Sequence, residues 1–306
     1  MGIAEVIPGV SGGTIAFITG IYERLINMIK AFDIQFFQYI KSRNFTAAFQ
    51  HVDGPFIISL ASGMLLGIVV GVFGVDYCLL AYPELLWAFF FGLILASVYV
   101  VYHMLHKKSW SLIIPLIIGI VIAAAVVSLN PRPGSSQMLY LFFCGMIAIC
   151  ALILPGISGS FILLLLGMYT LVIPTLKSFL SGPSFDEFKI LAIFGMGCIV
   201  GLLLFARLLS WTFKNFYDPT LALLCGFMIG SLNKIWPWRK GILGMDESGK
   251  LVEIVKGMEV DKIIKEVNLL PAQYGLEVGS PHVLGAIACM LIGFVMVFAL
   301  EKLGFE

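Results

Sequence analysis

Charged side chains are scarce in this chain, and that scarcity excludes ordinary soluble folds. Only 12% of the 306 residues are charged, 60% are hydrophobic, and the mean hydropathy is +1.02. Because soluble globular domains are about 25% charged, we predict an all-α polytopic membrane protein. The formal net charge is only +1, which gives no support for nucleic-acid binding or a polybasic membrane tail.

Signatures of enzyme, cofactor and metal sites are also missing. The cysteines lack CxxC or Cys/His ligand spacing, and we interpret them as packing residues. The four histidines are scattered without an HExxH pattern, and no Walker loop is present. We therefore expect no enzymatic activity, no cofactor and no metal, and any transport is secondary or passive. No secretory signal pattern precedes the first motif, so the opening apolar run is expected to remain in the mature protein.

What the chain does have is a short motif that occurs twice. PGVSGG occupies residues 8–13 and PGISGS occupies residues 155–160, both within strongly apolar sequence. The same shift of 147 positions also aligns Gly20 with Gly167. Proline lacks a backbone donor and paired glycines weaken a helix, so we expect broken backbone at both copies. In lipid, broken backbone survives only where it lines a protein cavity, and two matched breaks indicate a transport site.

The remaining sequence predicts several full membrane spans, each close to the about 20 apolar residues that cross a bilayer. These spans are Pro55–Val75, Leu85–Tyr102, Ser111–Leu129, Phe188–Leu209, Thr220–Ile235 and His282–Glu301. Two further apolar stretches, residues 1–29 and 138–176, each contain one motif. We predict that each stretch is a re-entrant hairpin or a broken span.

This order of elements predicts two repeats of inverted topology. Each half is a broken element followed by three spans, and three crossings would place the second half upside down relative to the first. We predict membrane repeats at residues 1–137 and 138–306, with a small extramembrane insertion at 237–280 that contains a hairpin and a helix. The region 31–54 is expected to be a connecting loop. Lysine and arginine placement gives conflicting signals, so the orientation in the membrane stays open.

The motif residues are suited to an anion. Helix N-termini bind anions through free backbone amides and the helix dipole, and nearby hydroxyl groups add donors. The candidate substrate-binding residues are Ser11, Gly12, Gly13, Thr14, Ser158, Gly159, Ser160 and Arg207. A simpler interpretation is a kink that lets helices pack closely through small residues. That interpretation would be preferred for a single copy, whereas two copies at matched positions favour a binding site.

Charged residues near the motifs are few, and each has two interpretations. Glu5 lies three residues before Pro8 and is either an intramembrane proton carrier or an interfacial carboxylate near the start of the chain. Arg207 ends an apolar run, so it either extends to the lipid headgroups or contacts phosphate. Lys30 and Lys177 align across the repeat and are interpreted as interfacial anchors.

These residues carry a family resemblance. The opening GIAEVIPGVSGGTIAFITGIYERLI, together with the second PGISGS and the GMY that follows it, closely resembles the bacterial PopT family of polyprenyl-phosphate transporters. The resemblance covers nearly the whole chain. It implies movement of undecaprenyl phosphate from the outer to the cytoplasmic leaflet of the bacterial cytoplasmic membrane. That step would recycle the lipid carrier used for peptidoglycan and other envelope polymers.

The resemblance and the motif chemistry together suggest alternating access. In this hypothesis both PGxSG loops hold the phosphate while the tail stays in lipid, and protons are the candidate coupling ion through Glu5. A homo-oligomer is left open. The alternative is a small-anion channel or exchanger that uses the same helix N-termini. A lipid-phosphate phosphatase would need a nucleophile and a base, and the sequence shows no such pair.

Overall fold

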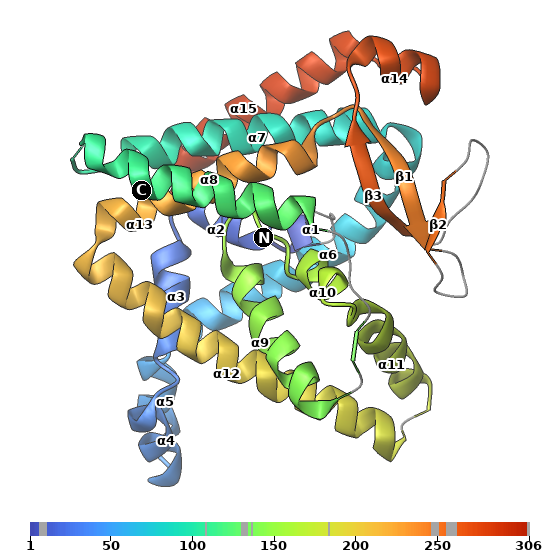
Figure 1. Ribbon diagram of the computed structural model, residues 1–306. Coiled ribbons are helices and arrows are strands. Elements are labelled where there is room, and N and C mark those ends of the chain that lie inside the picture. The colour runs from blue at the N-terminus through green and yellow to red at the C-terminus, as the bar shows by residue number, and fades with distance from the viewer. Residues whose placement is uncertain are drawn as a thin grey trace.

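The structure is a computed structural model that describes residues 1–5, 11–107, 109–129, 134–135, 137–182, 184–245, 251–254 and 262–304. It is mostly helical (Figure 1). The first half contains α1 (Gly2–Glu5), α2 (Gly12–Ile18), α3 (Tyr22–Lys30), α4 (Ile34–Lys41), α5 (Phe45–His51), α6 (Gly54–Ala81), α7 (Pro83–His103), the 3-10 turn η1 (Trp110–Leu112) and α8 (Ile113–Ser128). The second half contains α9 (Met138–Ile153), α10 (Gly159–Leu165), α11 (Tyr169–Ser181), α12 (Phe185–Asn215), α13 (Tyr217–Ser231), the 3-10 turn η2 (Leu232–Ile235), α14 (Pro271–Glu277) and α15 (Val283–Gly304).

The chain follows the same local path after each motif. Helices α2 and α10 both have seven residues, and each begins at the motif glycine that follows its serine. Each helix then stops at a turn that contains a left-handed glycine, with φ 69° at Gly20 and 68° at Gly167. Because this backbone region strongly favours glycine, the aligned glycines specify the same turn in both halves. The next helix, α3 or α11, leaves in a new direction, and α10 and α11 meet at an angle of 117°.

Long apolar helices make this a multi-pass membrane protein. Among the described residues, four helical stretches are long and apolar enough to cross a bilayer, namely Gly54–Gly71, Pro83–His103, Trp110–Ser128 and Phe185–Asn215. The bent pair α10 and α11 would make a fifth. Two predicted spans are shorter than expected. Helix α13 has 15 residues, and the apolar part of α15 is Val283–Ala299. The 3-10 turn η2 and the following Pro237 prevent α13 from continuing.

Helices from the two halves pack against each other in matched pairs. Helix α7 lies against α15 and α8 lies against α13, side by side in the upper part of Figure 1. Gly92 of α7 faces the carbonyl of Met290, and Gly226 of α13 faces the carbonyl of Leu116, so closely that a Cβ at either glycine would overlap the oxygen. Gly92 and Gly226 are aligned in the sequence repeat by a shift of 134 positions. The same small residue therefore allows an equivalent close contact twice.

The segment 31–54, which we expected to be a loop, forms the helices α4 and α5. They project together at the bottom of Figure 1. Each begins at a short polar side chain that caps its first turn. Asp33 Oδ1 accepts from the amide of Phe36 at 3.0 Å, and Asn44 Oδ1 accepts from the amide of Ala47 at 3.1 Å. These capping residues were the available sequence signal for two short helices.

The insertion after α13 contains a small antiparallel sheet, which departs from an all-helical fold. Strands β1 (Arg239–Met245), β2 (Leu251–Glu253) and β3 (Lys262–Asn268) are arranged in the order β2-β1-β3. The predicted hairpin is confirmed as β1 and β2, although its turn, residues 246–250, lies outside the described part of the chain. The helix was predicted on the polar run 252–267, where the described residues form parts of β2 and β3 instead, and the helix of the insertion is α14. The third strand was missed because its sequence, KIIKEVN, does not alternate regularly between apolar and polar residues.

Candidate functional site

The two repeated motifs meet inside the protein. Ser11 has extended backbone angles at the N-cap of α2, and its Oγ accepts a hydrogen bond from the amide of Gly13 at 3.1 Å. The same hydroxyl donates to the carbonyl of Leu152 at 2.9 Å, just before the second motif. Ser11 is 1% exposed. Its hydroxyl therefore both caps the first broken helix and bonds to the second one.

Two more side chains of the first half bond to the second break. The amide of Gly156 donates to Thr14 Oγ1 at 3.1 Å, and Thr14 is fully buried. The hydroxyl of Tyr22 donates to the carbonyl of Ile153 at 3.2 Å. A chain break in an apolar interior leaves backbone groups without helical partners, and each such group is costly unless it is paired. Ser11, Thr14 and Tyr22 of the first half together supply partners for three of these groups.

A carboxylate occupies the N-terminus of α2. Glu5 Oε1 accepts a hydrogen bond from the amide of Gly12 at 3.0 Å. A Cβ on Gly12 would overlap this oxygen, so glycine is needed for the contact. The sequence predicted an anion at this helix end, and the structure places the protein's own carboxylate there. Pro8, Gly9 and the rest of residues 6–10 lie outside the described part of the chain.

The second motif is more open to ligands than the first. The hydroxyl oxygens of Ser158 and Ser160 lie 3.0 Å apart, Ser158 is half-buried and Ser160 is exposed. Ser158 forms no side-chain cap on α10, unlike Ser11 on α2. Gly159 lies close to the carbonyl of Ala148, where an added Cβ would be 2.7 Å from the oxygen. The two hydroxyls are therefore the accessible polar groups among the predicted motif residues.

Lys234, which no sequence pattern indicated, lines the same small pocket as Ser158. A narrow pocket of about 10 Å³ is lined by Gly156, Ser158, Phe161 and Lys234, with Val126 and Val127 of α8. Lys234 Nζ lies 5.2 Å from the centre of the Phe161 ring. Lys234 belongs to η2, 74 residues after Ser160 in the chain. No spacing in the sequence could have joined them, because only the packing of α13 beside the second motif does so.

Lys234 is held in place by the insertion. Its Nζ pairs with Glu266 of β3 at 3.1 Å, and Arg239 of β1 pairs with the same carboxylate at 2.6 Å. The guanidinium of Arg239 also lies 4.0 Å above the ring of Trp87. Burial lowers the pKa of Arg239, and the nearby Glu266 carboxylate opposes that shift. The small sheet thus positions a cation beside the second motif.

Arg207 is not brought to the motifs. It is exposed on α12, and no hydrogen bond or ion pair among the described residues joins it to either loop. Ser210 follows three residues later, and Lys214 seven residues later, so all three share one side of the helix. This side of α12 is polar at its C-terminal end.

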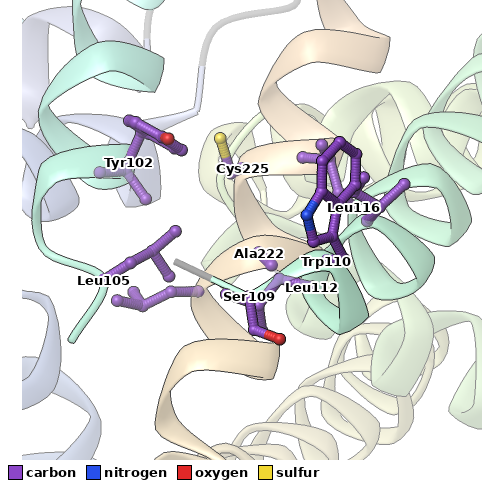
Figure 2. Close-up of a pocket in the computed structure, with 11 residues that line it drawn as sticks. Tyr102, Leu105, Ser109, Trp110, Leu112, Leu116, Ala222 and Cys225 are labelled. Atoms are coloured by element: carbon purple, nitrogen blue, oxygen red, sulfur yellow. The ribbon is translucent and has the colours of Figure 1, made fainter. Parts of the chain in front are cut away.

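An apolar groove lies away from the motifs, near the end of α7. It has a volume of about 360 Å³ and runs between the end of α7, the start of α8 and the start of α13. Figure 2 shows Tyr102 and Leu105 on one side, Trp110 and Leu116 on the other, and Cys225 between them. Groups of this kind suit hydrocarbon rather than a polar ligand.

Comparison with known sequences identifies the family of this chain. Residues 1–252 match the undecaprenyl phosphate translocase-like family. The chain belongs to this family. The family description and the names of two similar proteins refer to transporters and not to enzymes. This agrees with the expectation that the chain is not an enzyme.

Two similar proteins are both named polyprenyl-phosphate transporter. The one from Vibrio cholerae is 38% identical over 304 residues, covering 99% of this chain and 93% of that protein. The one from Staphylococcus aureus is 32% identical over 251 residues, covering 78% of this chain and 83% of that protein. No solved structure matches the chain. The resemblance found from the two motifs is therefore confirmed at the level of the family.

Proposed function

We propose that this protein is a flippase that carries undecaprenyl phosphate, or a related polyprenyl phosphate, between the leaflets of the bacterial cytoplasmic membrane. This step would recycle the lipid carrier for envelope synthesis. The observation that carries the proposal is the junction of the two broken loops. Buried hydrogen bonds join them, while Ser158, Ser160 and Lys234 stay accessible beside the junction. Hydroxyl groups and one ammonium are the donors that a phosphate requires.

The site must widen before it can hold a phosphate. Its volume of about 10 Å³ barely admits the centre of one water molecule. In our proposal the phosphate oxygens accept hydrogen bonds from the hydroxyls of Ser158 and Ser160 and from the Lys234 ammonium. That ammonium has three protons, and one of them already contacts Glu266. The amide of Gly159 at the start of α10 adds a donor from the backbone.

The first loop acts on the second in this proposal. Ser11 and Thr14 hold the second break in place, so a movement of α2 changes the shape of the phosphate site. The Glu5 carboxylate accepts the hydrogen bond from the amide of Gly12, where a phosphate oxygen could otherwise bind. A proton on Glu5 would weaken this hydrogen bond. We propose this as the coupling step between a proton gradient and transport, with Gly12 and Gly13 as the moving contacts. The matched halves then alternate as inverted repeats at residues 1–137 and 138–306.

The isoprenoid tail needs no protein site along its whole length. Only the charged head has a large free-energy cost of transfer into hydrocarbon, whereas the apolar tail is soluble in the bilayer. The site therefore has to shelter one phosphate during crossing and leave the tail in lipid. Arg207, exposed on α12, would contact the phosphate only at the membrane surface, before or after crossing.

The proposal is tested with purified protein in liposomes that contain a labelled undecaprenyl phosphate. Wild-type protein should accelerate movement of the label between leaflets, and a phosphatidyl lipid should not move faster. Lys234→Gln should raise the substrate concentration for half-maximal transport by about tenfold, as expected for loss of a charge-assisted hydrogen bond. Lys189→Gln, an exposed lysine on α12, is the matched control. Movement of small anions without any movement of the lipid would instead establish the anion channel or exchanger.

A further inference from the structure

A polar pocket of about 300 Å³ lies between α3 and α12, outside both motifs. Its lining includes Glu23, Asn27 and Lys30 of α3 and Ser210, Phe213 and Lys214 of α12. From the sequence alone, Lys30 was interpreted as an interfacial anchor. In the structure Lys30 faces a second lysine across a cavity large enough for a ligand, which an anchor in the headgroup layer does not require.

The pocket presents several hydrogen-bond donors that have no partner among the described residues. Lys30 Nζ donates to Ser210 Oγ at 3.1 Å, and Ser210 Oγ donates to Asn27 Oδ1 at 3.3 Å. An ammonium has three protons, so Lys30 retains two, and the Asn27 amide nitrogen retains its own. Lys30 and Lys214 form no ion pair with a carboxylate in the described part of the chain. The network thus orients Lys30 and leaves its charge available.

The charge of the pocket favours a phosphate. Glu23 is the one carboxylate among the described residues of its lining, and the hydroxyl of Tyr217 is hydrogen-bonded to it. Two lysines and one glutamate leave a net charge of +1 in the empty pocket. A phosphate monoester carries about −1.5 to −2 at pH 7 and accepts hydrogen bonds through several oxygens. Its charge and acceptors complement the unused lysine and asparagine donors.

One wall of the pocket is connected to the motif junction. The ring of Phe213 meets the ring of Tyr22 edge-on, with their centres 6.1 Å apart. Tyr22 in turn donates its hydroxyl hydrogen bond to the carbonyl of Ile153, at the break before the second motif. A ligand that displaces Phe213 would therefore press on a residue that bonds to the second loop.

The pocket and the Lys234 site lie at opposite ends of α13. Lys214 comes just before α13, and Lys234 comes just after it in η2. Fifteen residues of helix span about 22 Å, which approaches the thickness of the hydrocarbon core. The α3–α12 pocket measures about 300 Å³ and the Lys234 site about 10 Å³, so one end is open while the other is closed. The apolar groove of Figure 2 lies at the open end, beside the start of α13.

We infer that the α3–α12 pocket is a second phosphate site, which receives the lipid phosphate from the leaflet opposite the Lys234 site. This inference rests on the proposed transport function and adds a second binding site to the same transport pathway. Lys30 and Lys214 bind the phosphate oxygens, and Asn27 donates through its amide. Glu23 is held aside by Tyr217. Free phosphate has the same headgroup chemistry and is the other source that a test must separate.

The first test measures binding without transport. Farnesyl phosphate and inorganic phosphate are titrated into detergent-solubilised Lys234→Gln protein, which isolates the α3–α12 pocket. Adding Lys214→Gln should weaken binding by about tenfold, whereas adding Lys41→Gln, an exposed lysine on α4, should not change it. Lys214 is exposed and its substitution leaves the Lys30 network intact, so the fold should be retained. Preference for farnesyl phosphate identifies a lipid ligand, and equal binding identifies free phosphate. Binding unaffected by Lys214→Gln overturns the site.

The second test measures transport from each leaflet separately, in liposomes where the protein has one orientation. In the double variant Lys30→Gln with Lys214→Gln, the substrate concentration for half-maximal transport should rise about tenfold or more when substrate is offered to one leaflet. The rise should be smaller when substrate is offered to the other leaflet. Lys234→Gln should show the opposite preference. Equal effects from both leaflets, or none, overturn the inference. A wild-type protein that binds phosphate through Lys214 but moves no lipid would disprove the transport function and leave the site standing. Normal transport by the double variant would disprove the second site and leave the transport function standing.

Discussion

The hydroxyl oxygen of Thr14 accepts a hydrogen bond from the backbone amide of Gly156 at 3.1 Å, which joins one repeated motif to the other. Thr14 is fully buried, and Gly156 has a left-handed φ of 85°. The amide at such a turn has no helical partner, so the threonine side chain provides the acceptor that the backbone lacks. The two halves are therefore coupled by a specific polar contact in addition to apolar packing.

Replacement of Thr14 by valine tests this coupling. Valine keeps the shape but removes the acceptor, which leaves the buried amide of Gly156 unpaired at a cost of about 1–3 kcal/mol. We expect a lower thermal unfolding temperature and faster amide exchange at residues 152–158. Thr14→Ser keeps the hydroxyl and should lie much closer to the wild type. Equal stability of the valine and serine variants would show that the bond contributes nothing.

Replacement of Glu5 by glutamine tests proton coupling. Glutamine retains an oxygen that can accept from the amide of Gly12, but it has no titrating charge. We expect transport of polyprenyl phosphate in liposomes to continue and to lose its dependence on a pH gradient. Asp186→Asn, an exposed carboxylate at the start of α12, should retain the gradient dependence. A glutamine variant that still responds to the gradient would assign the proton to another group.

Replacement of Gly226 by alanine tests the close contact of α13 with α8. The new methyl group would overlap the carbonyl of Leu116, so we expect a loss of about 1–3 kcal/mol from overpacking. Among the described residues, no atom beyond the chain neighbours and local backbone of α12 lies within 4 Å of the Cβ position of Gly195, and Gly195→Ala should be neutral or slightly stabilising. Thermal unfolding in one detergent measures both. Similar effects at the two sites would contradict the packing argument.

Replacement of Glu266 by glutamine tests the insertion. Arg239 has only 5% of its side chain exposed, and loss of its partner charge should cost about 3–5 kcal/mol. The matched control is Glu277→Gln, whose partner Lys240 is 39% exposed and whose loss should cost at most about 1 kcal/mol. Limited proteolysis should cut residues 239–277 much faster in the first variant alone. Equal cutting rates would show that Arg239 does not depend on Glu266.

The local form of each motif was predictable because backbone chemistry decides it. A proline with neighbouring glycines disfavours a continuous membrane helix, and the aligned Gly20 and Gly167 adopt the same left-handed turn. Four of the predicted apolar spans coincide with helices long enough to cross a bilayer, whereas α13 stops early at η2 and the apolar part of α15 is also short. Helices α4 and α5 were missed because short amphipathic helices give weak periodicity, and Asp33 and Asn44 were the clearest signals.

The sequence alone determined that this is a multi-pass membrane protein of a transporter family, with one short motif that occurs twice and the same glycine spacing after each copy. Composition and short-range backbone preferences contain that information, since they act within a few residues. Tertiary structure alone decided that Thr14 bonds to Gly156, that Lys234 lies beside Ser158, and that Lys30 faces Lys214. Such pairs are far apart in the chain and are set by helix packing, for which a single sequence contains no direct signal.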